Sequence, residues 1–581
     1  MARSVSQLTV AVMTAAVVVV AVVVVGMQPI SCSAINNIPA EPRVCEAHPP
    51  GQTLRHGGRP PQSCFFQTIV EGGECVPRNN SVSGPGLIIE FAPDPTHIPV
   101  VDRIPAENIT TATRDALAST ARVVNLQLTG ILHSKDLEWL LGTTWPTVDS
   151  IELSGLVNSS LDLSTMDALP NLRRIDAAGN QIIALTKIKN KQLPFAANLV
   201  YFNLADNLLS TIPDALFNGL ENLKSLILND NLLTDLSPAL LASLPSLQFL
   251  NVRNNRIPNL AAATFQPTPD LRALDLRANR ISSLHTDLFK PLRNLTHLWL
   301  ANNRQLTTDT LARTARKADD SYGTRDCALN KYIDGKPEDP QCNHSPTCDG
   351  FLPRASASDS DVTAFLAAGA FDTLTNLCHL DMGELNLITI PANLFANLGN
   401  LTFMSLSGNM FPTLPQTLLH GLTRLATLSL DRNRIECLPA LLFRDQVELR
   451  VLGLSRNRLA CLPQNLFPPT NKLERVGLAS NRLHTLPRDA VQALSQLVFL
   501  QLDANSFSSF NHNLPALRAL QLSHNCFLGQ LPDRGALHQP HERDLDLEAG
   551  LEPGEQLVGH QRVDSILDDP PQLEDLVFGV D

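Results

Sequence analysis

Aromatic residues are scarce in this sequence: they make up 5% of 581 residues, and Trp and Tyr occur three times each. Cationic residues are outnumbered too, since 45 Lys and Arg face 57 Asp and Glu and leave a formal charge of −12. That balance disfavours a general nucleic-acid binder, which needs a basic surface to displace counterions from phosphate. Apolar residues still amount to 44%, enough for a folded chain. The length exceeds that of one ordinary globular core.

Catalytic motifs are also missing. The sequence contains no G-x-S-x-G, P-loop, H-E-x-x-H or dinucleotide fingerprint, and its isolated His, Ser and Asp residues are interpreted as solvated loop positions. Cys342, His344 and Cys348 form C-x-H-x₃-C, a spacing that allows zinc, but disulfides are the better interpretation in a secreted loop. We therefore predict no enzyme, no cofactor and no metal site.

The longest apolar run lies at the start of the chain. An uncharged stretch from Leu8 to Val25 follows a basic residue and predicts a signal peptide over residues 1–26. Small residues allow cleavage after Gly26 or after Ala34. The alternative is an uncleaved anchor, because about 20 apolar residues can span a bilayer. No later segment is apolar for as long, and the acidic end excludes a lipid-anchor signal. We expect an extracellular, secreted protein, or else one anchored in the membrane by its N-terminus.

A period of 24 residues dominates most of the chain. Strong copies read "LKSLILNDNLL" from Leu223, "LRALDLRANRI" from Leu271 and "LRVLGLSRNRL" from Leu449. Weaker copies, such as those from Val123 and Leu377, bring the number to about fifteen. A fixed period of this size indicates a solenoid, in which each unit packs only against its neighbours.

The segment L-x-x-L-x-L in each copy predicts a short strand with one inward face, because its leucines alternate with polar residues. One such strand is unstable alone, whereas stacked copies form a parallel sheet over a column of leucines. An Asn then turns the chain, and its amide can both donate to and accept from backbone groups. Twelve copies carry it: Asn180, Asn207, Asn231, Asn255, Asn279, Asn303, Asn409, Asn433, Asn457, Asn481, Asn505 and Asn525.

The return half of each copy, such as "IPDALFNGLENL" from Ile212, combines Pro with a recurrent Phe. Pro prevents a long helix from entering there, so we expect turns and single helical turns on the convex side. The phenylalanines should stack beneath that side as an aromatic spine. They are Phe217, Phe265, Phe289, Phe395, Phe443 and Phe467.

The combined pattern L-x-x-L-x-L-x-x-N-x-L-x-x-L-P-x-x-L-F-x-x-L-x-N resembles the typical, 24-residue subtype of extracellular leucine-rich repeats, found in Toll-like receptor and Slit-like ectodomains. The resemblance covers about residues 120–525. It implies an α/β leucine-rich-repeat solenoid, a right-handed horseshoe with a parallel β-sheet on its concave face. It implies no single function, because the family binds proteins, glycans and lipids. Ile131, Leu156 and Leu385 replace the turn Asn, and no cysteine-rich cap is recognisable after the last repeat.

Segments outside the repeats complete the expected organisation. We expect a Cys/Pro/Gly-rich N-terminal region over 27–115, repeats over 120–303, a Cys-containing insertion over 304–370, repeats over 371–530 and an acidic, disordered tail over 531–581. Plant receptor ectodomains of this repeat class resemble the chain in having an insertion, which they use for ligand binding. Long loops are usually functional or disordered, and we predict that this one works with the concave face.

Eleven cysteines and six glycosylation sequons agree with export. Cys437 and Cys461 hold the same position in adjacent repeats, so stacking about 5 Å apart predicts a disulfide; the alternative is two buried thiols. Further disulfide candidates, whose pairing the sequence does not define, are Cys327, Cys342, Cys348 and Cys378. The glycosylation candidates are Asn79, Asn108, Asn158, Asn294, Asn343 and Asn400.

Recognition through the concave face is the function that we predict. Strand positions between the core leucines point outward there, and aromatic residues beside Arg have the composition of interface hot spots. The candidate partner-binding residues are Tyr201, Phe249, Arg253, Asp275, Arg277, His297 and Trp299. For some of them the alternative is packing against neighbours. We expect a protein or glycan ligand, without nucleic acid, in adhesion or receptor-like recognition; the alternative is a structural extracellular-matrix component.

Overall fold

The computed structural model describes residues 86–91, 104–105, 111–119, 125–130, 134–156, 159–187, 193–303, 369–510 and 512–526. The chain divides into two compact units. Among the described residues, unit 1 holds those between 86 and 208 together with 218–222, and unit 2 holds 209–217 and those between 223 and 526. The predicted signal peptide, the cysteines before residue 378 and the acidic tail lie outside the described residues.

Unit 1 contains a parallel sheet that begins before the first expected repeat. Strand β1 (Gly86–Phe91) pairs with β2 (Ile104–Pro105) and with β3 (Asn125–Gly130). The sheet continues through β4 (Ser150–Leu153) and β6 (Arg174–Asp176) to β8 (Tyr201–Asn203). A separate parallel pair joins β5 (Ser159–Asp162) to β7 (Ile182–Thr186). Short helices complete the unit: α3 (Thr111–Ser119), α4 (Ser134–Leu140) and the 3₁₀ helix η3 (Leu163–Ala168).

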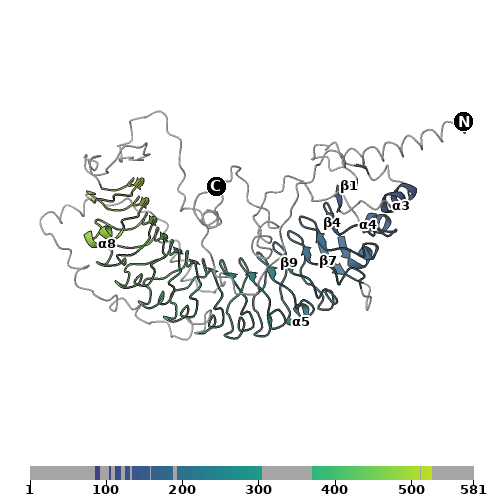
Figure 1. Cartoon of the computed structure of the whole chain (residues 1–581), viewed down its shortest axis with the longest axis horizontal. Helices are drawn as coiled ribbons and strands as arrows, with labels where there is room; N and C mark the ends of the chain where they lie inside the picture. The colour runs from purple at the N-terminus through teal and green to yellow at the C-terminus, as the bar shows by residue number, and fades with distance from the viewer. Residues whose placement is uncertain are drawn as a thin grey trace, which may run out of the picture. The chain divides into compact units, whose positions relative to one another are not determined.

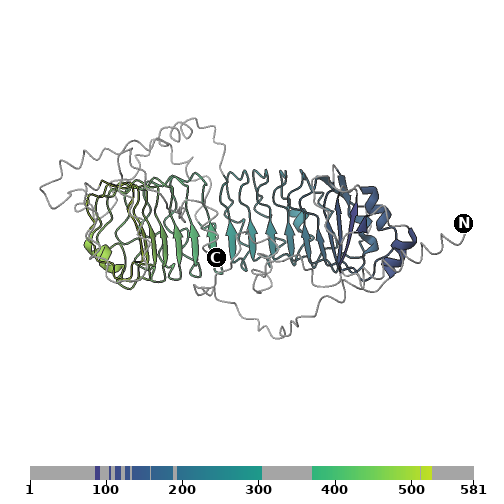
Figure 2. The same ribbon diagram turned by 90° about the horizontal axis from the view of Figure 1, so that it is seen from above.

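Unit 2 is a solenoid with one parallel sheet, whose strands lie side by side in Figure 2. Each strand pairs with the next along the chain without a slip in register. The predicted parallel-sheet solenoid is thereby confirmed. Its strands are β9 (Ser225–Ile227), β10 (Phe249–Asn251), β11 (Ala273–Asp275), β12 (His297–Trp299), β13 (His379–Asp381), β14 (Phe403–Ser405), β15 (Thr427–Ser429), β16 (Val451–Gly453), β17 (Arg475–Gly477), β18 (Phe499–Gln501) and β19 (Ala519–Gln521).

The return halves of unit 2 contain little helix. The helices described there are α5 (Pro238–Leu241) and α8 (Arg488–Ala493), both labelled in Figure 1, and turns make up most of the remainder. Ser237 caps α5, since its hydroxyl accepts from the N–H of Ala239 at 3.1 Å. Pro at the first helical position suits a short helix that starts there and soon ends.

The predicted aromatic spine is present in the interior of unit 2. The rings of Phe265 and Phe289 stack with centroids 6.3 Å apart, and those of Phe443 and Phe467 at 5.8 Å. Phe371, which the sequence analysis did not include, fills the place between Phe289 and Phe395 at 6.0 and 6.3 Å. These rings are buried, so each removes a large apolar surface from water.

Each turn Asn ties one repeat to the preceding one. Asn457 accepts from the N–H of Ile435 at 3.0 Å and donates to the carbonyls of Leu430 and Leu454 at 2.9 and 3.0 Å. All twelve predicted residues accept from the preceding repeat in this way. The residue before each Asn has a left-handed backbone, as Asn254 (φ 51°) and Gly408 (φ 66°) illustrate. We call these twelve residues the asparagine ladder.

The stack is continuous across the insertion. β12 and β13 pair directly, with His297 opposite His379, although 304–368 lie between them in the sequence. Leu385 replaces the ladder Asn in the repeat that follows. In other repeats, the ladder Asn accepts from the N–H two residues after the ladder Asn of the preceding repeat. Here that N–H would belong to the inserted segment, which begins directly after Asn303. The carbonyl of Leu300 already accepts from Asn303 at 2.7 Å, so Leu385 leaves that group satisfied.

Candidate functional site

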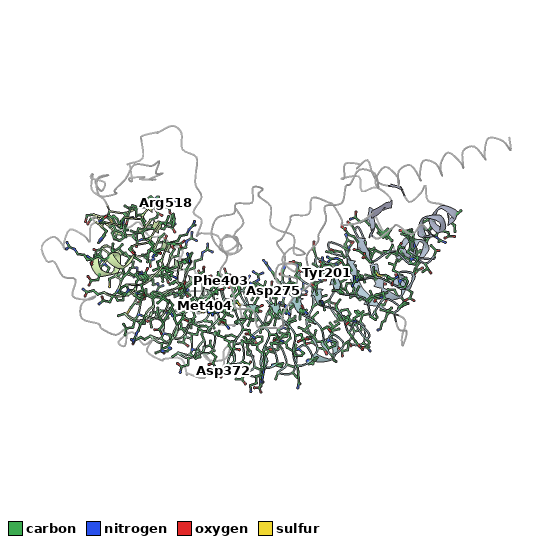
Figure 3. All side chains as sticks on the ribbon, in the orientation of Figure 1. Tyr201, Asp275, Asp372, Phe403, Met404 and Arg518 are labelled. Atoms are coloured by element: carbon green, nitrogen blue, oxygen red, sulfur yellow. The ribbon has the colours of Figure 1, made fainter. Side chains whose placement is uncertain are left out.

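The sheet of unit 2 has a face that turns away from the leucine core, which we call the front face. It consists of the strand residues that alternate with the core leucines, and of the next outward residue after each strand. In Figure 3, Asp275 and Phe403 lie at this side of the unit, whereas Asp372 lies at the opposite side. The front face is the surface that the sequence analysis expected to be concave and to bind a partner.

Four front-face rings from three neighbouring strands form one cluster, which we call the aromatic strip: His297, Trp299, His379 and Phe403. The ring of His297 stacks on Trp299 and on His379, with centroids 5.5 and 5.6 Å apart. His379 also lies 5.2 Å from Trp299 and stacks on Phe403 at 4.1 Å. Since adjacent strands are only about 4.8 Å apart, planar rings at the same register position cover each other's faces.

An ion pair extends the strip onto β11. Asp275 and Arg277 form a bidentate pair, with Nε 3.1 Å from Oδ1 and a terminal nitrogen 2.8 Å from Oδ2. The guanidinium carbon of Arg277 lies 5.6 Å from the ring centre of Trp299. Bidentate bonding and a cation–π contact restrain the same side chain. Arg277 is therefore held in one orientation at the edge of the strip.

Burial keeps both histidines of the strip neutral near neutral pH. Burial lowers the pKa of His297 to about 4, from an ordinary value of 6.5. Burial also lowers the pKa of His379 well below 6.5, and the nearby His297 and Arg277 act in the same direction. An imidazolium in this place would lose hydration and meet a like charge. The Nδ1 atom of His297 lies 2.9 Å from the hydroxyl of Thr296.

The expected exposure of the candidate aromatic residues is wrong. Phe249 and Trp299 are each 2% exposed and Asp275 is 4% exposed, whereas Arg253 is exposed and Arg277 and His297 are half-buried. Stacking between strands contributes to this burial. Tyr201 belongs to unit 1, where it is 1% exposed and lies under the guanidinium of Arg174, 4.2 Å from its ring centre. The accessible candidates in unit 2 are thus Arg253, Arg277 and His297.

The front face changes character at β16 and β17. Gly453 and Gly477 occupy positions held by Asp275 and Trp299 farther along the sheet. At Gly453 any side chain would collide with the carboxylate of Asp431, which is buried and accepts from Ser429 Oγ and from the N–H of Ser455 at 2.8 and 2.6 Å. The position of Gly453 on β16 therefore has no room for a larger side chain.

The comparisons with known proteins agree with the repeat pattern. A family model described as leucine rich repeat matches residues 197–257, 250–304 and 471–527. These stretches are leucine-rich repeats. The resemblance predicted from the sequence is therefore confirmed. No curated protein is significantly similar to the chain in sequence.

Solved leucine-rich-repeat structures are similar to the chain at low identity. A leucine-rich-repeat protein of Leptospira interrogans is 22% identical, with 68% of this chain and 87% of that chain covered and a TM-score of 0.49. Toll in a Drosophila Toll–Spätzle complex is 20% identical, with 69% and 55% covered and a TM-score of 0.47. A plant receptor kinase ectodomain from Arabidopsis thaliana, in complex with Casparian strip integrity factor 2, is 21% identical, with 73% and 44% covered and a TM-score of 0.46. The chain thus spans about half the length of those two receptor chains.

Sequence reasoning missed His379 and Asp381 because the repeat that holds them is weak. The register would have found them, since Leu377 starts "LCHLDM" and puts both residues on the front face. Within the described residues, no three His, Cys, Asp or Glu side chains are placed to bind a metal ion. No helix in the same part of the chain is long and apolar enough to cross a membrane. Leucine-rich-repeat solenoids generally serve as interaction scaffolds.

Proposed function

We propose that this chain is a secreted leucine-rich-repeat protein that binds a protein partner through the front face of unit 2, without enzymatic activity. The binding region would centre on Arg253, which is exposed, and on Arg277 and His297, which are partly exposed. Asp275 and Trp299 would hold Arg277 and His297 in place instead of contacting the partner first. Adhesion or receptor-like recognition fits such a surface.

The observation that carries this proposal is the rigid support beneath Arg277. Its guanidinium is bonded at two atoms to Asp275 and lies over Trp299, which in turn stacks on His297 and makes a tilted contact with the ring of His379. An arginine restrained before binding loses less conformational entropy when a partner arrives. Arginine and tryptophan are also the residue types that contribute most at interfaces.

The signal peptide and the sequons support secretion, and both stay predictions. The signal peptide and four of the six sequons lie outside the described residues. Of the remaining two, Asn294 is exposed, while Asn400 is half-buried. Asn400 donates to the carbonyl of Thr375 at 2.9 Å and accepts from Arg424 at 3.0 Å. We propose that Asn294 carries glycan more fully than Asn400.

The predicted role of the insertion also stays a prediction. Residues 304–368 lie outside the described residues, but their roots do not. The segment leaves after Asn303, four residues beyond Trp299, and the chain is described again from Gly369. The place where it leaves is thus close in sequence to the proposed binding region.

A direct test uses the secreted chain to capture partners, which mass spectrometry identifies, and then measures the dissociation constant of each purified pair. Arg253→Ala should raise the dissociation constant of a partner that binds the front face by about tenfold or more, as loss of a hot-spot arginine does. Arg475→Ala is the matched control, because Arg475 lies on the front face at β17, beside Gly477. Equal effects of the two substitutions, or none from Arg253→Ala and Arg277→Ala together, would show that recognition uses another surface. A chain retained inside the cell would contradict the secretion part of the proposal.

A further inference from the structure

A second charged surface lies at the turns that follow three neighbouring strands of unit 2. The ladder residue Asn433 has arginine on both sides, and so does Asn457, while arginine also follows Asn481. We call this surface the arginine edge. It consists of Arg432, Arg434, Arg456, Arg458 and Arg482.

The fold does not need arginine at these positions. Other repeats of unit 2 hold Asp230, Ala278 or Gly408 before the ladder Asn. After it they hold Leu232, Met410 or Ser506, although Arg256 and Arg280 also follow a ladder Asn. The position before the Asn is left-handed, with φ of 54° at Arg432 and 58° at Arg456. That conformation favours glycine and asparagine over a long side chain. Arginine is thus a costly choice there, and its charge is the feature that the other residues do not supply.

The ladder fixes the backbone of the edge at a regular spacing. The N–H groups of Arg434, Arg458 and Arg482 donate to carbonyls of the preceding turn at 3.1, 2.9 and 2.8 Å. Successive strands of a sheet are about 4.8 Å apart, so these arginines form a row along the stacking direction. Arg482 is exposed and the others are half-buried.

The edge carries five arginines, in a chain whose formal charge is −12. One nearby carboxylate, Asp431, is buried and bonded to Ser429. Another, Glu436, lies 3.5 Å from Arg458, and both side chains are about a third exposed, where ion pairs contribute little. Ahead of the strands, basic residues are also paired with acids one repeat away, as Lys472 is with Glu448 at 2.7 Å.

We propose that the arginine edge binds a linear polyanion, a sulfated glycosaminoglycan chain. Guanidinium forks match the planar or tetrahedral oxygens of carboxylate and sulfate and lose hydration more readily than ammonium groups. A row of equally spaced cations fits a polymer with anions at regular intervals better than it fits the irregular surface of an acidic globular protein. This inference uses the extracellular location from the proposed function, but it is independent of front-face recognition.

The test measures binding of the full secreted chain to a size-defined heparin oligosaccharide across a range of salt concentrations. The edge variant carries Arg434→Gln, Arg458→Gln and Arg482→Gln together. A control variant with the same change in net charge carries glutamine at three exposed arginines elsewhere in unit 2: Arg293, Arg444 and Arg488. By analogy with phosphate, each arginine that neutralises a sulfate releases about one counterion, so the edge variant should lower the salt slope by about 3. It should also bind at least tenfold more weakly near physiological salt.

The control variant should change the affinity less than twofold and keep the salt slope. Arg253→Ala on the front face should leave heparin binding unchanged even if it abolishes partner binding, so the two proposals fail separately. Equal losses in the edge and control variants would overturn the inference, because binding would then depend on net charge alone. So would stronger binding to a single-stranded RNA of equal charge than to heparin. A full chain that fails to bind heparin at low salt would overturn it as well.

Discussion

The histidines of the aromatic strip should make unit 2 sensitive to acid. The pKa of His297 is about 4 in the folded chain and 6.5 in the unfolded chain. The unfolded state therefore binds the proton first, and stability falls as the pH drops below 6.5 towards 4. Above 6.5 the residue is neutral in both states and has no effect. The lowered pKa of His379 acts in the same direction.

The size of the effect follows from the two pKa values of His297. Between about pH 7 and about pH 5, proton linkage for this residue alone removes about 2 kcal/mol of stability. His297→Phe eliminates the titration and keeps a ring in the stack, as Phe403 does two strands away. The variant should lose about 2 kcal/mol less than the parent between these pH values.

Urea unfolding followed by circular dichroism measures this difference, with the midpoint and slope determined at each pH. His420→Gln is the control, because the side chain of His420 is 77% exposed. It should reproduce the acid sensitivity of the parent. If His297→Phe, alone and combined with His379→Phe, loses stability on acidification as steeply as the parent, the strip is not the acid-sensitive element and the reasoning is wrong.

Three further outcomes test the repeats and the export proposal. Asn457→Ala should lower stability by about 3 kcal/mol, because it leaves buried backbone groups without partners; urea unfolding measures it, and a loss under about 1 kcal/mol would contradict the ladder's role. Cys437 and Cys461 should resist alkylation without reductant and yield one linked peptide by mass spectrometry; free thiols at both positions would disprove the disulfide. Glycopeptide analysis of secreted protein should find Asn294 more fully occupied than Asn400, and the reverse order would argue against exposure as the deciding factor.

The sequence alone determined the repeating part of this protein. Asn457 and its equivalents act within one repeat and its neighbour, so a local pattern repeated every 24 residues defines both their place and their bonds. The same holds for the aromatic spine, because one phenylalanine position in each repeat stacks on the same position in the next repeat. Phe371 was missed only because the insertion separates this return half from the strand of its own repeat.

Only the tertiary structure decided which front-face groups are accessible. Burial depends on everything packed around a side chain, and a repeat pattern gives the direction of Trp299 and Phe249 but not what covers them. β12 pairs directly with β13 across 304–368, as one stack of repeats implies, but the ring contacts that this pairing makes were not predicted. That pairing brings His379 against His297 and Trp299 and completes the aromatic strip. Contacts between residues this far apart arise from how the repeats stack, which no single repeat specifies.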